Sequence, residues 1–268
     1  MWARVARWMH LVLVMCLVLV ACSSSNPGAS LPDPPPAQEL DPPPEQEPDQ
    51  ATDQEDAHHT VTVEDVERSY RLLVPDTVDE PAPVVIVFHG AGGSSEGVAE
   101  VTQFDRVANQ NGFAVAYPDA FEPEIWGATW NVEFCCFRAP EGGFDDVGFV
   151  DVLVDVLGDH DRIDMDRVYL AGISNGGALA YRYACLHADR IAGVASVAAA
   201  MLVDDCEPAG AVSILEIHGT GDEVVPFEGG DLYPPDLATS PIPPIPVVVE
   251  FWADRSRCSE PVVIGTIP

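Results

Sequence analysis

Short apolar runs alternate with segments of helical spacing along residues 59–268. Residues 83–89 (PVVIVFH) form a continuous, mostly β-branched run, which is typical of a strand buried on both faces in a parallel sheet. Residues 59–74 (HTVTVEDVERSYRLLV) predict two short strands in a hairpin. Further strands are predicted at residues 113–117, 167–171, 191–200 and 214–218.

Between these strands, apolar residues recur with the spacing of one helix face. The predicted helices cover residues 96–111, 145–157, 175–187 and 247–257. The first of them ends at Asn111-Gly112, where glycine favours a helix stop. Strands that alternate with helices predict an α/β fold, a doubly wound and mostly parallel sheet flanked by helices, with ligands at the carboxyl ends of the strands.

The first 22 residues have the features of an export leader. Arg4 and Arg7 precede an apolar run, residues 11–20, that is too short to span a membrane comfortably. The run ends in LVAC, which resembles the lipobox of bacterial lipoproteins and implies that Cys22 is lipidated and tethers the protein to a membrane. The alternative is ordinary secretory cleavage beside a chance cysteine. Either interpretation predicts an exported protein, in the cell envelope or outside the cell.

Two further segments follow the leader. Residues 23–58 are rich in proline, serine and acids and have little apolar surface to bury, so they predict a disordered tether. Residues 59–268 form the predicted folded domain. The formal charge is -32, from 44 acidic residues against 12 arginines and no lysine, which argues against nucleic acid as a partner. Adaptation to a salty medium and the codon preference of a GC-rich genome account equally well for this charge.

Five cysteines remain after the leader, so in an oxidising compartment at least one is expected to have no partner within this chain. Cys135 and Cys136 are adjacent and lack the C-x₂-C spacing of a zinc site, and no His-x₃-His pattern lies near them. The residues therefore indicate neither a metal site nor a cofactor.

A candidate nucleophile lies between a predicted strand and a predicted helix. Gly172-Ile173-Ser174-Asn175-Gly176 fits the pattern G-x-S-x-G, in which the serine occupies a strained turn and the glycines allow close packing. This context predicts that Ser174 is the nucleophile of a serine hydrolase. The alternative is a glycine-rich turn with a solvent-facing serine.

Two other strand ends supply the groups that such a nucleophile needs. After residues 83–89, the sequence His89-Gly90-Ala91-Gly92-Gly93 predicts an oxyanion hole from the N–H groups of Ala91 and Asn175. His89 is expected to fix this loop by hydrogen bonding, with a catalytic role as the alternative. Asp222, which follows the strand at residues 214–218, is the candidate triad acid in the order Ser, Asp, His.

FHGAGGS, WN…CC, DDVGF, IDMDRVYLAGISNGGALAYRYAC and HGTGDEVVPFEGG occur in this order between about Arg68 and Cys258. Together they resemble the polyhydroxybutyrate depolymerase and feruloyl esterase-like group of secreted α/β-hydrolases. The resemblance implies an α/β-hydrolase fold and hydrolysis of polyhydroxyalkanoate, feruloyl or acetyl-glycan esters through an acyl-enzyme on Ser174. It also implies a disulfide between Cys135 or Cys136 and Cys185, and another between Cys206 and Cys258.

The histidine of the triad is missing from its expected place. In the family that residue lies on a loop after one more strand, beyond the helix that here contains Phe251. Residues 262–267 are predicted to begin this strand, and no histidine follows His218. Three explanations are open: a fragment or frameshifted frame of an active enzyme lacking the last strand and helix, which we favour, a pseudoenzyme that binds esters or glycans, or His89 acting as the base.

The substrate is expected to be selected by residues 121–141 and by the segment that would carry the histidine. Two tryptophans in this loop, Trp126 and Trp130, suggest an aromatic platform for a sugar or a phenol, or else a packing role within the loop.

Overall fold

The computed structural model describes residues 15–18, 55–78, 81–121, 127–132, 135–136, 144–203, 205–234 and 241–258. Cys22, residues 23–54 of the predicted tether, Trp126 and the predicted strand at residues 262–267 lie outside the described residues. Within the described part of the chain, none of the helices has both the length and the hydropathy needed to cross a bilayer.

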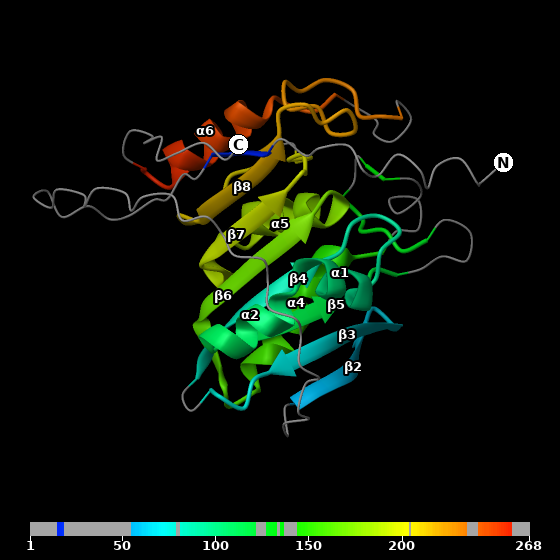
Figure 1. The fold of residues 1–268 in the computed structure, drawn as a ribbon, viewed down its shortest axis with the longest axis vertical. Helices are drawn as coiled ribbons and strands as arrows, with labels where there is room; N and C mark the ends of the chain where they lie inside the picture. Colours follow the sequence, from blue (N-terminus) through cyan, green and yellow to red (C-terminus); the bar gives the residue numbers. More distant parts are fainter. Residues whose placement is uncertain are drawn as a thin grey trace, which may run out of the picture.

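The centre of the fold is an eight-stranded sheet in the order β1-β8-β7-β6-β4-β5-β3-β2. Strands β4 to β8 pair in parallel, as the continuous apolar runs predicted. Their bounds are Ala82–Phe88, Ala114–Pro118, Ile163–Ile173, Gly193–Val197 and Ser213–Gly219. Figure 1 shows the sheet running from the hairpin at one end to β8, beside which β1 forms the opposite edge.

The two ends of the sheet are antiparallel. The predicted hairpin is confirmed as β2 (Glu55–Val63) and β3 (Val66–Val74), and β3 pairs with β5. Strand β2 begins at Glu55, four residues before the predicted start of the folded domain at His59. At the opposite edge, β1 (Met15–Val18), which belongs to the predicted leader, pairs with β8.

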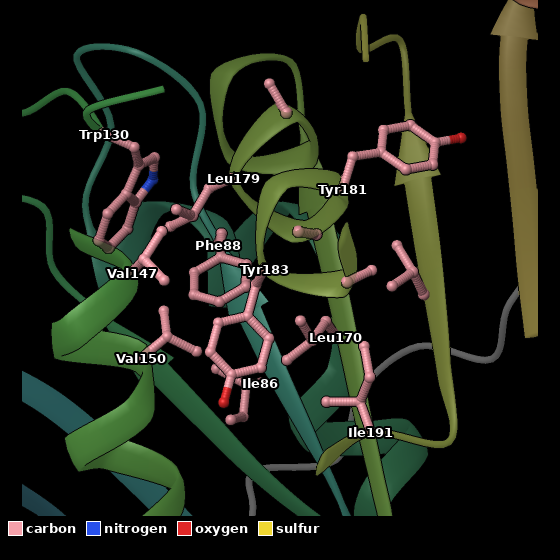
Figure 2. Close-up of a cluster of buried hydrophobic side chains, with 14 of the residues drawn as sticks. Ile86, Phe88, Trp130, Val147, Val150, Leu170, Leu179, Tyr181, Tyr183 and Ile191 are labelled. Atoms are coloured by element: carbon pink, nitrogen blue, oxygen red, sulfur yellow. The ribbon is translucent and has the colours of Figure 1, made fainter. Parts of the chain in front are cut away.

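Helices cover both faces of the sheet (Figure 1). Helices α4 (Asp146–Gly158), α5 (Asn175–Leu186) and α6 (Ile245–Arg255) share the larger core with inward side chains of the central strands. Figure 2 shows part of this core, where Phe88, Leu170, Leu179 and Tyr183 pack between strands and helices. A smaller core on the other face includes side chains of α1 (Ser95–Thr102) and α2 (Phe104–Asn111).

The prediction of one helix over residues 96–111 was wrong. Gln103 has φ 55°, a left-handed conformation that ends α1, and its N–H bonds to the carbonyl of Ala99 while α2 starts at Phe104. The break turns Phe104 toward Phe113, with ring centroids 6.3 Å apart. Val98 of α1 and Ala108 of α2 lie in the same small core, so the apolar spacing continues across both helices and gave no sign of the break.

The disulfide pairing implied by the resemblance was also wrong. Cys185 bonds to Cys206 and Cys135 bonds to Cys136, so Cys206 is not available to Cys258. The bond from Cys185 joins the last turn of α5 to the loop after β7, two segments that lie over the same core.

Candidate active site

Ser174 lies in the turn between β6 and α5, at the carboxyl end of the parallel strands. Its φ of 53° is left-handed, a conformation that costs free energy for a residue with a side chain and that occurs in functional turns. A Cβ added to Gly172 would lie 2.4 Å from the carbonyl of Gly176, and one added to Gly176 would lie 2.4 Å from the carbonyl oxygen of His89. The two glycines are therefore required because strand, helix and the loop after β4 meet here without space for side chains.

The loop after β4 lies directly against Ser174. A Cβ built on Gly90 would be 3.6 Å from the Cβ of Ser174, and the N–H of Gly93 closes a turn onto the Gly90 carbonyl at 3.0 Å. Ala91 is exposed within this turn, and Asn175 is the first residue of α5, where amides have no partner within the helix. The structure thus brings the loop of Ala91 against Ser174, which is followed directly by the amide of Asn175, while their role as oxyanion donors stays a prediction.

His89 is held by two hydrogen bonds to the main chain. Its Nδ1 lies 2.7 Å from the carbonyl oxygen of Gly90, and its Nε2 accepts from the N–H of Ala120 at 3.1 Å. These partners require the neutral ring with the proton on Nδ1. Burial lowers the pKa of His89, against smaller opposing effects from Gly90 and nearby carboxylates. The interpretation of His89 as a loop-fixing residue is supported, because neither ring nitrogen is available as a base.

Asp222 lies in the turn that follows β8. Its Oδ1 accepts from the N–H groups of Val224 at 2.8 Å and Val225 at 2.9 Å, which fixes the carboxylate in a short turn. Its Oδ2 is 3.7 Å from Nε2 of His218. The carboxylate is therefore anchored through one oxygen at a strand end.

A buried network lies beneath this turn. His218 Nε2 donates to the carbonyl oxygen of Val225 at 2.8 Å, and Nδ1 lies within hydrogen-bond distance of Glu216 Oε1, at 3.1 Å. Burial opposes a charge on His218, but the bonds to Glu216 and Val225 and the Glu216 charge outweigh it and raise the pKa of His218. Tyr181, whose pKa is raised chiefly by burial, donates its hydroxyl to Glu216 Oε2 at 2.6 Å. The network supports the turn of Asp222 and occupies both nitrogens of His218.

No hydrogen bond joins Ser174 to a histidine in the described part of the chain. His58 and His59 lie on β2, far along the sequence from the elbow, and His187 follows α5 and is 3.6 Å from Asp151. Among the described residues, no group of three or more histidines, cysteines and acids is arranged to hold a metal ion.

Sequence reasoning left the role of Trp130 open and missed the ion pair of Arg68 with Asp146. Trp130 has an exposure of 0%, so the prediction of a surface platform was wrong for it and the packing interpretation is confirmed. Arg68 and Asp146 form an ion pair at 2.6 Å whose side chains are 3% and 1% exposed. The available signal was that Arg68 shares the inward-facing alternation of β3 with Tyr70 and Leu72, because a buried charge needs a partner.

The parallel sheet, the left-handed serine between β6 and α5, and the loop after β4 define an α/β-hydrolase. Residues 68–232 match the family described as esterase PHB depolymerase. The protein NocK of Nocardia uniformis subsp. tsuyamanensis, which is named as an esterase, is 33% identical over 254 residues, covering 91% of this chain and 72% of that protein. The chain belongs to this family of carboxylic ester hydrolases.

Two further similarities cover a smaller part of the chain. Feruloyl esterase B of Piromyces equi is 35% identical over 159 residues, which cover 58% of this chain and 28% of that protein. The solved structure of an S-formylglutathione hydrolase from Agrobacterium tumefaciens covers 56% of this chain and 60% of that one, with a TM-score of 0.48 and 23% identity.

Proposed function

We propose that the protein is a serine esterase that hydrolyses carboxylic esters through an acyl-enzyme on Ser174. The observation that carries the proposal is the left-handed turn of Ser174, which lies against Gly90 of the loop after β4. This turn places Ser174 at the carboxyl ends of the parallel strands, in a chain that belongs to a family of ester hydrolases. Non-catalytic ester binding is not favoured, because the relatives are named for hydrolysis.

Each proposed site residue acts in a particular step of ester hydrolysis. Ser174 Oγ attacks the ester carbonyl, and the N–H groups of Ala91 and Asn175 stabilise the negative charge on the carbonyl oxygen. The alcohol leaves with a proton, and water then attacks the acyl-enzyme to release the acid and regenerate Ser174. The resemblance implies a histidine as the proton carrier, and Asp222, fixed through Oδ1, would orient it and balance its charge.

The proposed substrates are esters of polyhydroxyalkanoate, feruloyl-glycan or acetyl-glycan type. The name of the Piromyces relative supports a feruloyl ester in particular, although the match covers only part of that protein.

Active-site labelling tests the proposal directly. A fluorophosphonate reacts with serines activated by an enzyme, so the protein is expected to gain one adduct that peptide mass spectrometry maps to Ser174. Turnover of p-nitrophenyl butyrate and methyl ferulate is expected to stop in the labelled protein. Binding of methyl ferulate with neither adduct nor turnover would instead support a binding protein.

We also propose that the protein is exported and tethered to a membrane through a lipid on Cys22. The support is the sequence of residues 1–22, which has a basic start, an apolar run and a terminal LVAC. One acyl chain alone binds membranes weakly, so stable anchoring requires the diacylated cysteine of a lipoprotein.

Replacing Cys22 with alanine is expected to move the protein from the membrane fraction to the soluble fraction. The measurement is fractionation of cells that express either form, with metabolic labelling by a palmitate analogue. A Cys16→Ala variant is the control, since this cysteine lies within the apolar run. An unchanged distribution of the Cys22→Ala protein would rule out the lipid anchor.

A further inference from the structure

Residues 127–132 connect the two halves of the proposed oxyanion hole. At one end, the carbonyl of Ala128 accepts from the N–H of Gly92 at 2.7 Å, which ties the segment to the loop of Ala91. Two residues further along the chain, the main-chain N–H of Trp130 donates to Asn175 Oδ1 at 2.7 Å. In return, Asn175 Nδ2 donates to the main-chain carbonyl of Trp130 at 3.1 Å. One short segment therefore contacts the loop after β4 and the first residue of α5.

The indole of Trp130 strengthens the link to the loop. Its Nε1 donates to the carbonyl oxygen of His89 at 2.8 Å, and the two rings lie 4.9 Å apart. Below it, Phe88 packs edge-on at 5.4 Å, so the ring is enclosed on the core side. Figure 2 shows Trp130 above Phe88 and Val147, at the top of the core between α4 and α5. Because Trp130 is fully buried, its ring has no freedom to release these contacts without opening the core.

The far end of the segment is anchored to a charged pair. The N–H of Asn131 donates to Asp146 Oδ2 at 2.6 Å, and the other oxygen of Asp146 accepts from Arg68 at 2.6 Å. Asn131 Nδ2 also donates to the carbonyl of Phe144, just before α4. Residues 127–132 are thus anchored to β3 and to the start of α4. They also bond to Gly92 and to the Asn175 side chain, beside the two proposed donors.

We propose that Trp130 is a positioning residue, which sets the separation between the N–H groups of Ala91 and Asn175. The inference rests on the proposed esterase function and adds to it a residue that does not touch the substrate. An oxyanion hole works only when both donors lie about 2.7–3.1 Å from the developing oxyanion. A displacement of either donor therefore reduces the stabilisation of the transition state more than it reduces the affinity for substrate. Losing a whole donor lowers kcat by about 10²–10³-fold, which bounds the effect of misplacing one.

The test compares two buried tryptophans. Trp130→Phe keeps an aromatic ring and removes the indole N–H that binds His89, whereas Trp252→Phe makes the same change where the indole N–H has no partner among the described residues. Trp252 is also enclosed, with 1% exposure, and stacks on Tyr181 at 6.1 Å. We expect kcat on p-nitrophenyl butyrate to fall about 10- to 100-fold in Trp130→Phe, with KM within about twofold. Trp252→Phe is expected to keep kcat within about twofold.

Affinity for phenylboronic acid gives a second measurement, because its tetrahedral adduct on serine uses the oxyanion hole. Its Kd is expected to rise in parallel with the loss of kcat in Trp130→Phe, which a general loosening of the fold would not produce. If Trp130→Phe does not fold, Asn175→Ala removes the two bonds to Trp130 from the other side and keeps the Asn175 main-chain amide. The same loss of kcat at constant KM is expected there.

The outcomes separate the two proposals. Equal kcat values in Trp130→Phe and Trp252→Phe, with turnover that still depends on Ser174, would overturn the positioning role and leave the esterase function intact. Loss of kcat with a matching rise in KM would also overturn it, since this pattern reports substrate binding. Turnover that does not depend on Ser174 would overturn both.

Discussion

Replacing Ser174 with alanine is expected to lower kcat for ester hydrolysis, by up to about 10⁶ where a histidine reaches Ser174 as the proton carrier, because the acyl-enzyme can no longer form. The loss is set by the covalent step and not by folding, since alanine removes only the hydroxyl. About 10³-fold acceleration over water is expected to survive from the oxyanion donors and substrate binding. The measurement is steady-state turnover of p-nitrophenyl butyrate by the two purified proteins at equal concentration.

The matched control is Ser213→Ala, a serine exposed at the start of β8. It is expected to leave kcat unchanged within about twofold. The loss of kcat in Ser174→Ala is measured relative to the parent protein. Weak turnover by the parent protein would indicate that no proton carrier reaches Ser174. Turnover by Ser174→Ala within about tenfold of an active parent would contradict the nucleophile assignment.

Asp146→Ala is expected to lower the free energy of unfolding by about 3–5 kcal/mol. The reason is that Arg68, at 3% exposure, would keep its charge without the carboxylate that lies 2.6 Å away. The change also removes the acceptor of the Asn131 N–H, so part of the loss is an unpaired buried amide. Urea unfolding followed by tryptophan fluorescence measures the difference.

The neighbouring Asp145 provides the control for this prediction. Its side chain caps α4 by accepting from the N–H of Gly148 at 2.8 Å, so Asp145→Ala is expected to cost only about 1 kcal/mol. The double change Arg68→Met with Asp146→Leu removes both charges and is expected to recover much of the loss. Similar losses in Asp145→Ala and Asp146→Ala would show that the buried pair has no special contribution.

Local patterns in the sequence were enough to predict the sheet and the elbow. Each of β4 to β8 overlaps a run of apolar residues, because most side chains of a parallel strand covered on both faces are buried. Gly172 and Gly176 identify the elbow for a similar reason, since the close approach of backbones there forbids any Cβ.

Features that depend on distant residues were not predicted. The bond between Cys185 and Cys206 follows from how α5 packs beside the loop after β7, which no spacing encodes. The role of Trp130 requires two partners that are distant in the chain, the carbonyl oxygen of His89 and the side-chain amide of Asn175. Glu216 gave a weaker signal that was not used: a carboxylate within an apolar strand indicates a buried partner, and Tyr181 and His218 are those partners.

The bond from Cys185 to Cys206 has a consequence for the order of maturation. Both cysteines precede β8 in the chain and are separated by 21 residues, so under the proposed export oxidation can join them before β8 and the turn that carries Asp222 have been translocated. Helix α5, which starts beside Ser174, would then be cross-linked before Asp222 takes its place in the fold. Protein retained in a reducing cytoplasm would lack this cross-link. For a loop of this length a disulfide stabilises the folded state by about 3 kcal/mol, so the reduced form would be degraded more easily.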